Sequence, residues 1–169
     1  MSLPTKHFVV MGVSGCGKSS VARLLAERSG GTFLDADDFH PAANKAKMTA
    51  GVPLTDEDRW PWLDNLNARL KSLAQTEPPV FLACSALRQA YRDRLIADLS
   101  ALRFIYLQGS EELIRSRMEA RQDHFMPSAL LSSQFAALEE PHDAITLWID
   151  RPVSEIVERI LRAIQILQA

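Results

Sequence analysis

The chemistry of this chain is most clearly predicted by one glycine-rich stretch, GVSGCGKS, at residues 12–19. The stretch fits the pattern G-x-x-x-x-G-K-[ST], the P-loop, and it lies between an apolar segment and a helical pattern. Glycines let such a loop curl so that successive N–H groups point into one concavity, and the following helix directs its positive dipole end to the same place. The loop therefore predicts a site for the phosphates of a nucleoside triphosphate, and ATP is the expected ligand.

Individual residues of the loop have separate expected roles. Lys18 is expected to reach the β- and γ-phosphates, and Ser19 is expected to offer its hydroxyl to Mg²⁺. Cys16 occupies a free position of the motif, where an incidental small residue is expected rather than a reactive thiol. The predicted nucleotide contacts are Gly12, Val13, Ser14, Gly15, Cys16, Gly17, Lys18, Ser19 and Ser20.

A second candidate group is the acidic run Asp35-Ala36-Asp37, at the end of the next apolar segment. In a parallel α/β sheet the carboxyl ends of the strands lie on the ligand side. Asp37 is therefore expected to face the γ-phosphate, to orient an acceptor hydroxyl and to take its proton. Strand alternation would turn Asp35 to the other face, unless it helps to hold the waters of the magnesium ion. The alternative is that both acids only cap the next helix.

Several basic side chains could bind an anionic acceptor. Arginine gives planar, bidentate recognition of a carboxylate, and Arg59, Arg88 and Arg92 are the arginines best placed beside strand ends. Arg88 and Arg92 are four residues apart and are expected to share a helical face. His40, in the string DFHP, suits a sugar hydroxyl as a neutral donor and acceptor. Ordinary surface arginines and a packed or capping histidine are the alternatives.

A possible lid follows later in the chain. Arg117 and Arg121 are four residues apart, share a helical face and lead into QDHFMP, which has the composition of a turn. We expect a mobile lid at about residues 117–130 that closes over ATP, excludes water and brings these two arginines to the phosphates. His124 in this segment is a further predicted substrate contact. An ordinary helix surface followed by a turn is the alternative.

The elements that must position these residues alternate along the chain. Short apolar strands are predicted at 8–11, 32–37, 79–85, 103–108 and 144–149, and helices are predicted between and after them. A capping box at Thr55 and Asp58 marks the start of the longest helix. Strands that are apolar throughout and separated by helices predict a parallel sheet covered on both faces. The predicted fold is a single three-layer α/β/α domain over residues 1–169 with five parallel strands.

Bulk properties narrow the class of protein. The chain has 169 residues, 47% hydrophobic and 24% charged, with a formal net charge of -2. The chain has no concentrated cluster of basic residues, so a nucleic-acid partner is not expected. No apolar segment has the ~18 residues of a membrane span. Two cysteines without metal spacing suit a reducing compartment, so a cytoplasmic location is expected.

Four further blocks carry a resemblance to a known family. They are DADDFHPAANKAKMTAGVPLTDEDRWPWL (35–63), CSALRQAYRDRL (84–95), LQGSEELIRSRMEARQDHFMPSALLSSQF (107–135) and LEEP (138–141). Together with the P-loop they resemble the gluconokinases, P-loop kinases that phosphorylate D-gluconate with ATP. The resemblance implies transfer to the terminal hydroxyl, which gives 6-phospho-D-gluconate, and it implies a homodimer as one possible assembly. In that case the apolar faces of the later helices would serve either the dimer or the core.

Two other functions stay open on the residues alone. A kinase of another small hydroxy acid, similar to the shikimate kinases, has the same layout of P-loop and acidic run. A nucleotide-binding switch without turnover would also contain a P-loop, because this fold and loop do not decide function by themselves. Such a switch would be expected to lack an acceptor-side acid and arginines.

Overall fold

Five parallel strands form the centre of the computed structural model, which describes residues 7–74, 78–120 and 128–168. The strand order is β2-β3-β1-β4-β5, so the first strand lies in the middle of the sheet. The strands are β1 (His7–Met11), β2 (Thr32–Asp35), β3 (Val80–Ala83), β4 (Leu102–Gln108) and β5 (Ile145–Trp148). All four pairings are parallel, which confirms the predicted sheet.

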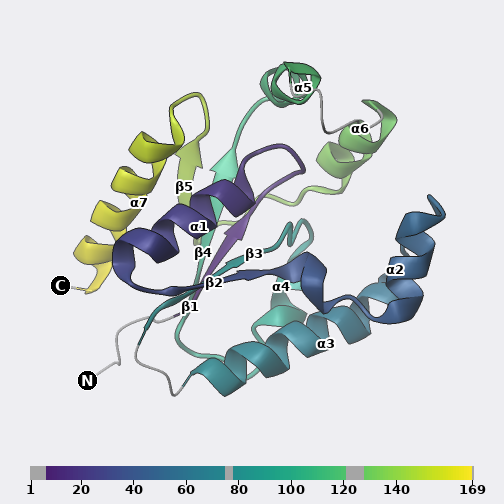
Figure 1. The fold of residues 1–169 in the computed structure, drawn as a ribbon, viewed down its shortest axis with the longest axis horizontal. Coiled ribbons are helices and arrows are strands. Elements are labelled where there is room, and N and C mark those ends of the chain that lie inside the picture. Colours follow the sequence, from purple (N-terminus) through teal and green to yellow (C-terminus); the bar gives the residue numbers. More distant parts are fainter. Residues whose placement is uncertain (1–6, 75–77, 121–127, 169) are drawn as a thin grey trace.

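Helices cover both faces of this sheet (Figure 1). The helices are α1 (Lys18–Ser29), α2 (Ala42–Thr49), α3 (Asp56–Leu73), α4 (Gln89–Leu95), α5 (Glu111–Ala120), α6 (Ser128–Ala137) and α7 (Val153–Gln168). Successive residues of β1 enter two different cores, because side chains alternate across a strand. Phe8 and Val10 pack with α1 and α7, whereas Val9 and Met11 pack with α3 and α4. The predicted three-layer α/β/α architecture is therefore confirmed.

Local sequence signals account for several element ends. Gly30 ends α1 in the left-handed conformation, with φ 70°, which glycine adopts without steric cost. Thr55 and Asp58 form the predicted capping box at the start of α3, each side chain accepting a backbone N–H of the other. Pro61 lies inside this helix and does not end it. The Ser110 hydroxyl accepts the Leu113 N–H and so caps α5.

The second strand ends earlier than predicted. The sequence predicts a strand over residues 32–37, but β2 stops at Asp35 and a 3₁₀ helix, η1 (Ala36–Phe39), follows. The cause is local, because the Asp35 side chain accepts the Asp37 N–H at 3.0 Å and caps this short helix. Asp37 therefore lies on a turn of helix and not on a strand.

The last helix decides between the two expectations for its apolar face. Its residues Ile156, Val157, Ile160 and Ile164 are buried in the core that contains α1. These side chains stabilise the monomer, and the predicted homodimer stays a prediction.

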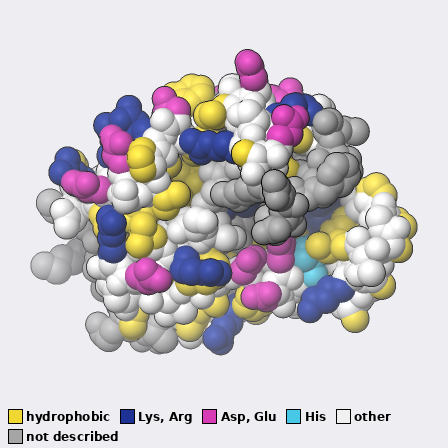
Figure 2. Space-filling model, turned by 45° about the horizontal axis from the view of Figure 1, so that its top comes forward, with side chains coloured by type: hydrophobic (Ala, Val, Ile, Leu, Met, Phe, Trp, Pro, Cys, Tyr) yellow, Lys and Arg dark blue, Asp and Glu magenta, His cyan; other side chains and the backbone are white. Residues whose placement is uncertain are grey.

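Lys, Arg, Asp and Glu side chains are interspersed on the face drawn in Figure 2. Among the described residues, no helix has the length and apolar character needed to cross a membrane.

Candidate active site

A cavity of about 730 Å³ opens at the carboxyl ends of the central strands. One wall is the P-loop between β1 and α1, and a second wall is the segment from Asp35 to His40 after β2. Arg59 and Trp62 of α3 and Ser85 after β3 contribute further lining, as do Met118 of α5 and Gln134 of α6. Segments far apart in the sequence therefore meet at the sheet edge where α/β proteins bind ligands.

The P-loop glycines are required by its geometry. Gly12 has φ 149°, and a Cβ there would lie 2.7 Å from the Cys16 Sγ and 2.9 Å from the Leu107 carbonyl oxygen. Gly17 has φ 96° and is the N-cap residue of α1, a conformation in which other residues are strained. The loop is thus held close against β4 and delivers its backbone to the start of the helix.

Six of the nine predicted nucleotide contacts line the cavity. They are Ser14, Gly15, Gly17, Lys18, Ser19 and Ser20. The remaining three do not: Gly12 is buried, and Val13 and Cys16 are core side chains with 3% and 2% exposure. Burial raises the pKa of the Cys16 thiol, which agrees with the prediction that this residue is not a reactive thiolate.

The Lys18 ammonium and the Ser14 backbone N–H of the loop already have protein partners. The Lys18 ammonium donates to the Val13 carbonyl oxygen at 3.0 Å, within the loop. The Ser14 N–H donates to the Gln134 Oε1 at 2.7 Å, and the Gln134 amide donates back to the Ser14 hydroxyl at 3.0 Å. Sequence reasoning missed Gln134, which lies 120 residues after Ser14 on a helix without a clear polar face. Only its place in the block LLSSQF, part of the family resemblance, marked it.

Asp35 and Asp37 line the same wall of the cavity. The expectation that strand alternation turns Asp35 to the other face is wrong, because the chain leaves the strand at Asp35 and enters the 3₁₀ helix. Partial desolvation, followed by the like charge of Asp35, raises the pKa of Asp37 above its ordinary value, although the side chain itself is 76% exposed to the cavity and solvent. His40 and Lys18 act on it in the opposite direction. A carboxylate with a raised pKa is a better proton acceptor.

His40 is fixed on several sides. Its ring stacks on Trp62 with centroids 4.2 Å apart, and the Trp62 indole N–H donates to the Ala36 carbonyl oxygen at 2.7 Å. Its Nε2 lies 4.0 Å from an Asp37 carboxylate oxygen, and its Nδ1 lies 3.2 Å from the Asn44 amide nitrogen. Burial lowers the pKa of His40, although the Asp37 charge partly offsets this effect. His40 is therefore packed against its neighbours, as one alternative predicted, and it also lines the cavity, as the other predicted.

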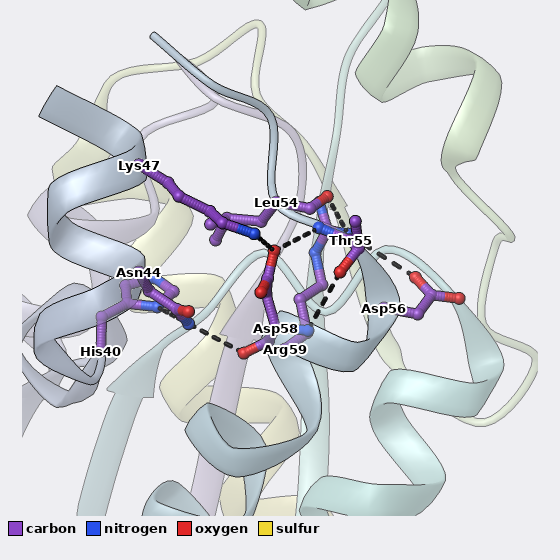
Figure 3. A network of polar contacts seen from close by, with 8 residues as sticks. All are labelled: His40, Asn44, Lys47, Leu54, Thr55, Asp56, Asp58 and Arg59. Carbon is purple, nitrogen blue, oxygen red and sulfur yellow. Dashed lines mark hydrogen bonds and ion pairs between the residues drawn. The ribbon is translucent and has the colours of Figure 1, made fainter. Parts of the chain in front are cut away.

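A polar network joins α2 to the beginning of α3 (Figure 3). Asn44 donates to the Asp58 carbonyl oxygen at 2.8 Å, and Lys47 donates to the Asp58 carboxylate at 2.7 Å. Hydrogen bonds from Lys47 and from the Thr55 backbone lower the pKa of Asp58 to about 2. The same turn carries Arg59, whose guanidinium donates to the Leu54 carbonyl oxygen at 2.9 Å and lies over the Tyr91 ring.

The three arginines predicted to bind the acceptor have different surroundings. Arg59 lines the cavity, whereas Arg88 and Arg92 do not. Arg88 is the exposed N-cap residue of α4. Arg92 is 2% exposed, so the expectation that the two share a face is wrong.

The Arg92 guanidinium is directed to the protein instead. It donates to the carbonyl oxygens of Ala86 at 2.6 Å, Leu87 at 3.2 Å and Glu139 at 2.7 Å, and to the Gln89 side chain at 3.1 Å. Ala86 has φ 46°, in the left-handed region where a residue with a Cβ is strained. Arg92 thus stabilises the turn after β3, and the prediction that it contacts the substrate is not supported.

The predicted lid is described only in part. The Arg117 guanidinium donates to the Ile149 carbonyl oxygen after β5, and Arg117 is not among the residues that line the cavity. Arg121 and His124 lie outside the described residues, as does the whole stretch 121–127 of the segment 117–130. Within the segment, Met118 lines the cavity and would be 2.8 Å from a Cβ at Gly15; beyond the segment, Gln134 of α6 also lines the cavity.

The oxygen donors of the cavity suit Mg²⁺. Ser19 offers a hydroxyl and Asp35 and Asp37 offer carboxylates, which are the hard ligands that this ion prefers. No cluster of three or more His, Cys, Asp or Glu side chains that could hold a metal occurs within residues 7–74, 78–120 and 128–168. Mg²⁺ is usually held by one or two protein oxygens together with the phosphates of a substrate, so the donor set fits an ion that arrives with a nucleotide.

Comparison with known proteins supplies the family context of this cavity. A family model described as an AAA domain matches residues 8–144. The thermosensitive gluconokinase of Escherichia coli (strain K12) is 42% identical over 163 residues, which cover 94% of this chain and 87% of that protein. A crystal structure of a gluconokinase from Sinorhizobium meliloti 1021 superposes with a TM-score of 0.87 at 42% identity, covering 98% of this chain and 95% of that one.

A more distant likeness concerns the fold alone. The APS kinase of Mycobacterium tuberculosis, solved in complex with AMPPNP and APS, superposes with a TM-score of 0.70 at 19% identity, covering 96% of this chain and 99% of that one. The α/β P-loop kinase architecture is therefore shared beyond the relatives of high identity.

Proposed function

Because this chain belongs to the AAA domain family and, within it, to the gluconokinases, we propose that it transfers the γ-phosphoryl group of ATP to D-gluconate. The product is 6-phospho-D-gluconate. The observation that carries this proposal is one cavity lined by both P-loop residues and acceptor-side groups. The P-loop contributes Ser14, Gly15, Gly17, Lys18 and Ser19, and the acceptor side contributes Asp37, His40 and Arg59. Both substrates of a direct transfer can therefore meet there.

The residues of the chain have separate tasks in the proposed reaction. Asp37 accepts the proton of the terminal hydroxyl as its oxygen bonds to the γ-phosphorus, and the bond between that phosphorus and the leaving ADP oxygen breaks. Lys18 leaves the Val13 carbonyl oxygen and neutralises charge on the phosphate oxygens. Mg²⁺, when bound by Ser19 and the phosphates, supplies further charge neutralisation.

Recognition of the sugar acid is assigned to the wall opposite the P-loop. Arg59 is half-buried and is the arginine of the predicted set that lines the cavity, so it is the proposed anchor for the gluconate carboxylate. His40 is the proposed partner of a substrate hydroxyl. Arg117, Arg121 and His124 remain predicted lid residues that act only in a closed complex.

The alternative functions have less support. A nucleotide-binding switch needs no acceptor-side groups, but Asp37, His40 and Arg59 line this cavity. A shikimate-kinase-like enzyme is not favoured, because the named relatives at 42% identity are gluconokinases.

The two cysteines are free and buried, which supports the proposed location of the protein in a reducing cytoplasm.

The experiment that tests the proposal is ADP release measured with the whole chain, ATP and Mg²⁺ across a panel of acceptors. The panel contains D-gluconate, other aldonic acids, D-glucose and shikimate. We expect the largest kcat/KM for D-gluconate, and mass spectrometry should place the phosphate on O6. A preference for shikimate, or no ADP release above the rate without acceptor, would refute the proposal.

A further inference from the structure

The contacts of Asn44 determine where the proton of His40 lies. The Asp58 carbonyl oxygen can only accept a hydrogen bond, so the Asn44 atom 2.8 Å from it must be the amide nitrogen. The second hydrogen of the same nitrogen is directed at the His40 Nδ1, 3.2 Å away. Nδ1 must therefore accept, and it carries no proton. The opposite ring nitrogen, Nε2, then carries the proton of the neutral imidazole.

The ring has little freedom to escape this arrangement. Trp62 stacks on it at 4.2 Å with planes 15° apart, and the His40 side chain is 4% exposed. The charged groups whose fields act on the ring are Asp37 from η1, Lys45 from α2 and Arg59 from α3. A second proton on Nδ1 would point at the Asn44 N–H, so the site disfavours the charged ring on geometric grounds.

We propose that Asn44 is a positioning residue that fixes His40 as the Nε2–H tautomer, so that His40 donates to the acceptor hydroxyl while Asp37 takes its proton. The spacing of the two groups supports this division. Nε2 and the Asp37 Oδ1 are 4.0 Å apart, too far for a direct hydrogen bond. A hydroxyl oxygen about 2.8 Å from each atom fits between them, accepting from one and donating to the other.

The tautomer of His40 determines which group receives the proton of the acceptor hydroxyl, a consequence that rests on the proposed function. With the proton on Nε2, His40 offers no lone pair to the cavity, so of these two groups only Asp37 can accept the hydroxyl proton. With the other tautomer, Nε2 would accept the same proton and would turn the hydroxyl away from the carboxylate. Asn44 thereby contributes to the reaction without touching the substrate.

The decisive variant is Asn44→Asp, tested by ¹⁵N NMR of the histidine rings and by the pH dependence of kcat. A carboxylate at position 44 accepts from Nδ1–H, so the neutral ring must carry its proton there. The wild type should show the Nε2–H tautomer. In N44D the doubly protonated ring still donates from Nε2, but kcat should fall about tenfold as pH rises through the His40 pKa read from the NMR titration. The wild type should show no such fall.

Lys47→Met is the matched control, because Lys47 also ties α2 to Asp58 but does not touch His40. It should leave the tautomer and the pH profile unchanged. If N44D does not fold, Asn44→Ala replaces it, and its ring signals should average between both tautomers while kcat falls several-fold at all pH values. Circular dichroism spectra should match those of the wild type for every variant that is used.

Three results would overturn the inference: a wild-type His40 with its proton on Nδ1, a ring that is charged at neutral pH, or an N44D profile that parallels the K47M profile. The NMR measurement needs no substrate, so it judges Asn44 even if D-gluconate is not phosphorylated. Conversely, gluconate turnover by a wild type with the wrong tautomer would leave the proposed function intact and remove the role of Asn44.

Discussion

Replacing Arg92 by Leu separates a structural arginine from a substrate anchor. The substitution removes the donor of four hydrogen bonds, three of them to the backbone carbonyl oxygens of Ala86, Leu87 and Glu139. Each buried acceptor that is left unsatisfied costs about 1–3 kcal/mol. Burial disfavours the charged guanidinium and lowers its pKa, so removing it returns part of that cost. The Leu87 oxygen keeps a hydrogen bond from the Glu139 N–H at 2.8 Å, so at most two of the carbonyl oxygens are left unsatisfied. We expect a net loss of roughly 2–4 kcal/mol in the free energy of unfolding.

The assay is urea denaturation followed by circular dichroism, with Arg88→Leu as the control. For a chain of this length, the expected loss lowers Tm by on the order of 10 °C. Arg88 is exposed, and its substitution should change the free energy of unfolding by less than about 0.5 kcal/mol. Michaelis constants for gluconate and ATP are then measured below the melting range of each variant.

A structural role and a substrate-binding role of Arg92 predict different outcomes. A stabiliser of the turn at Ala86 should lose stability without a selective rise of KM for gluconate. If R92L unfolds at the same urea concentration as the wild type and shows a selective rise of KM for gluconate, the guanidinium binds the substrate. The hydrogen bonds to the three carbonyl oxygens would then be incidental.

Four other substitutions test the cavity directly. Lys18→Ala should abolish turnover and leave Tm unchanged, because it removes charge stabilisation rather than packing; full activity by ADP release would contradict the P-loop assignment. Asp37→Asn should lower kcat by about 10²–10⁴-fold with the KM for ATP little changed, and a kcat near that of the wild type would reduce Asp37 to a structural acid. Arg59→Ala should raise the KM for gluconate by an amount that corresponds to about 2–5 kcal/mol and spare ATP, whereas a loss confined to ATP would move Arg59 to the phosphate side. Asp58→Asn should lower Tm at pH 6 but not at pH 2. The folded-state pKa of Asp58, about 2, lies below its ordinary value of 3.8, so the stabilisation by the Asp58 carboxylate is present above pH 3.8 and is lost as the pH falls through 2. A Tm difference that persists at pH 2 would exclude this linkage.

The fold was largely predictable from local patterns. The apolar strands and the Thr55–Asp58 capping box each depend on neighbours within a few residues, and both were confirmed. The end of β2 was not predicted, because the hydrogen bond that the Asp37 N–H donates to the Asp35 carboxylate competes with strand pairing over the same two residues. Because β2 ends at Asp35, the carboxylates of Asp35 and Asp37 both line the cavity.

The arginines show where local reasoning stops. Arg88 and Arg92 are the same residue type and lie four residues apart after β3, yet Arg88 is exposed and Arg92 is only 2% exposed. The difference arises because the segment around Glu139, 47 residues later, supplies a carbonyl oxygen to Arg92. No spacing within α4 contains that information.

The sequence by itself determined the phosphate cradle, the order of strands and helices, and the acid after the second strand, because these features depend on the backbone needs of a few consecutive residues. Only the tertiary structure decided which polar side chains share the cavity. Gln134 reaches Ser14 across 120 residues, and Asn44 fixes His40 through a carbonyl oxygen of α3. Such contacts form when separate elements pack on one sheet, so their partners are set by the packing of the whole chain and not by their neighbours in sequence.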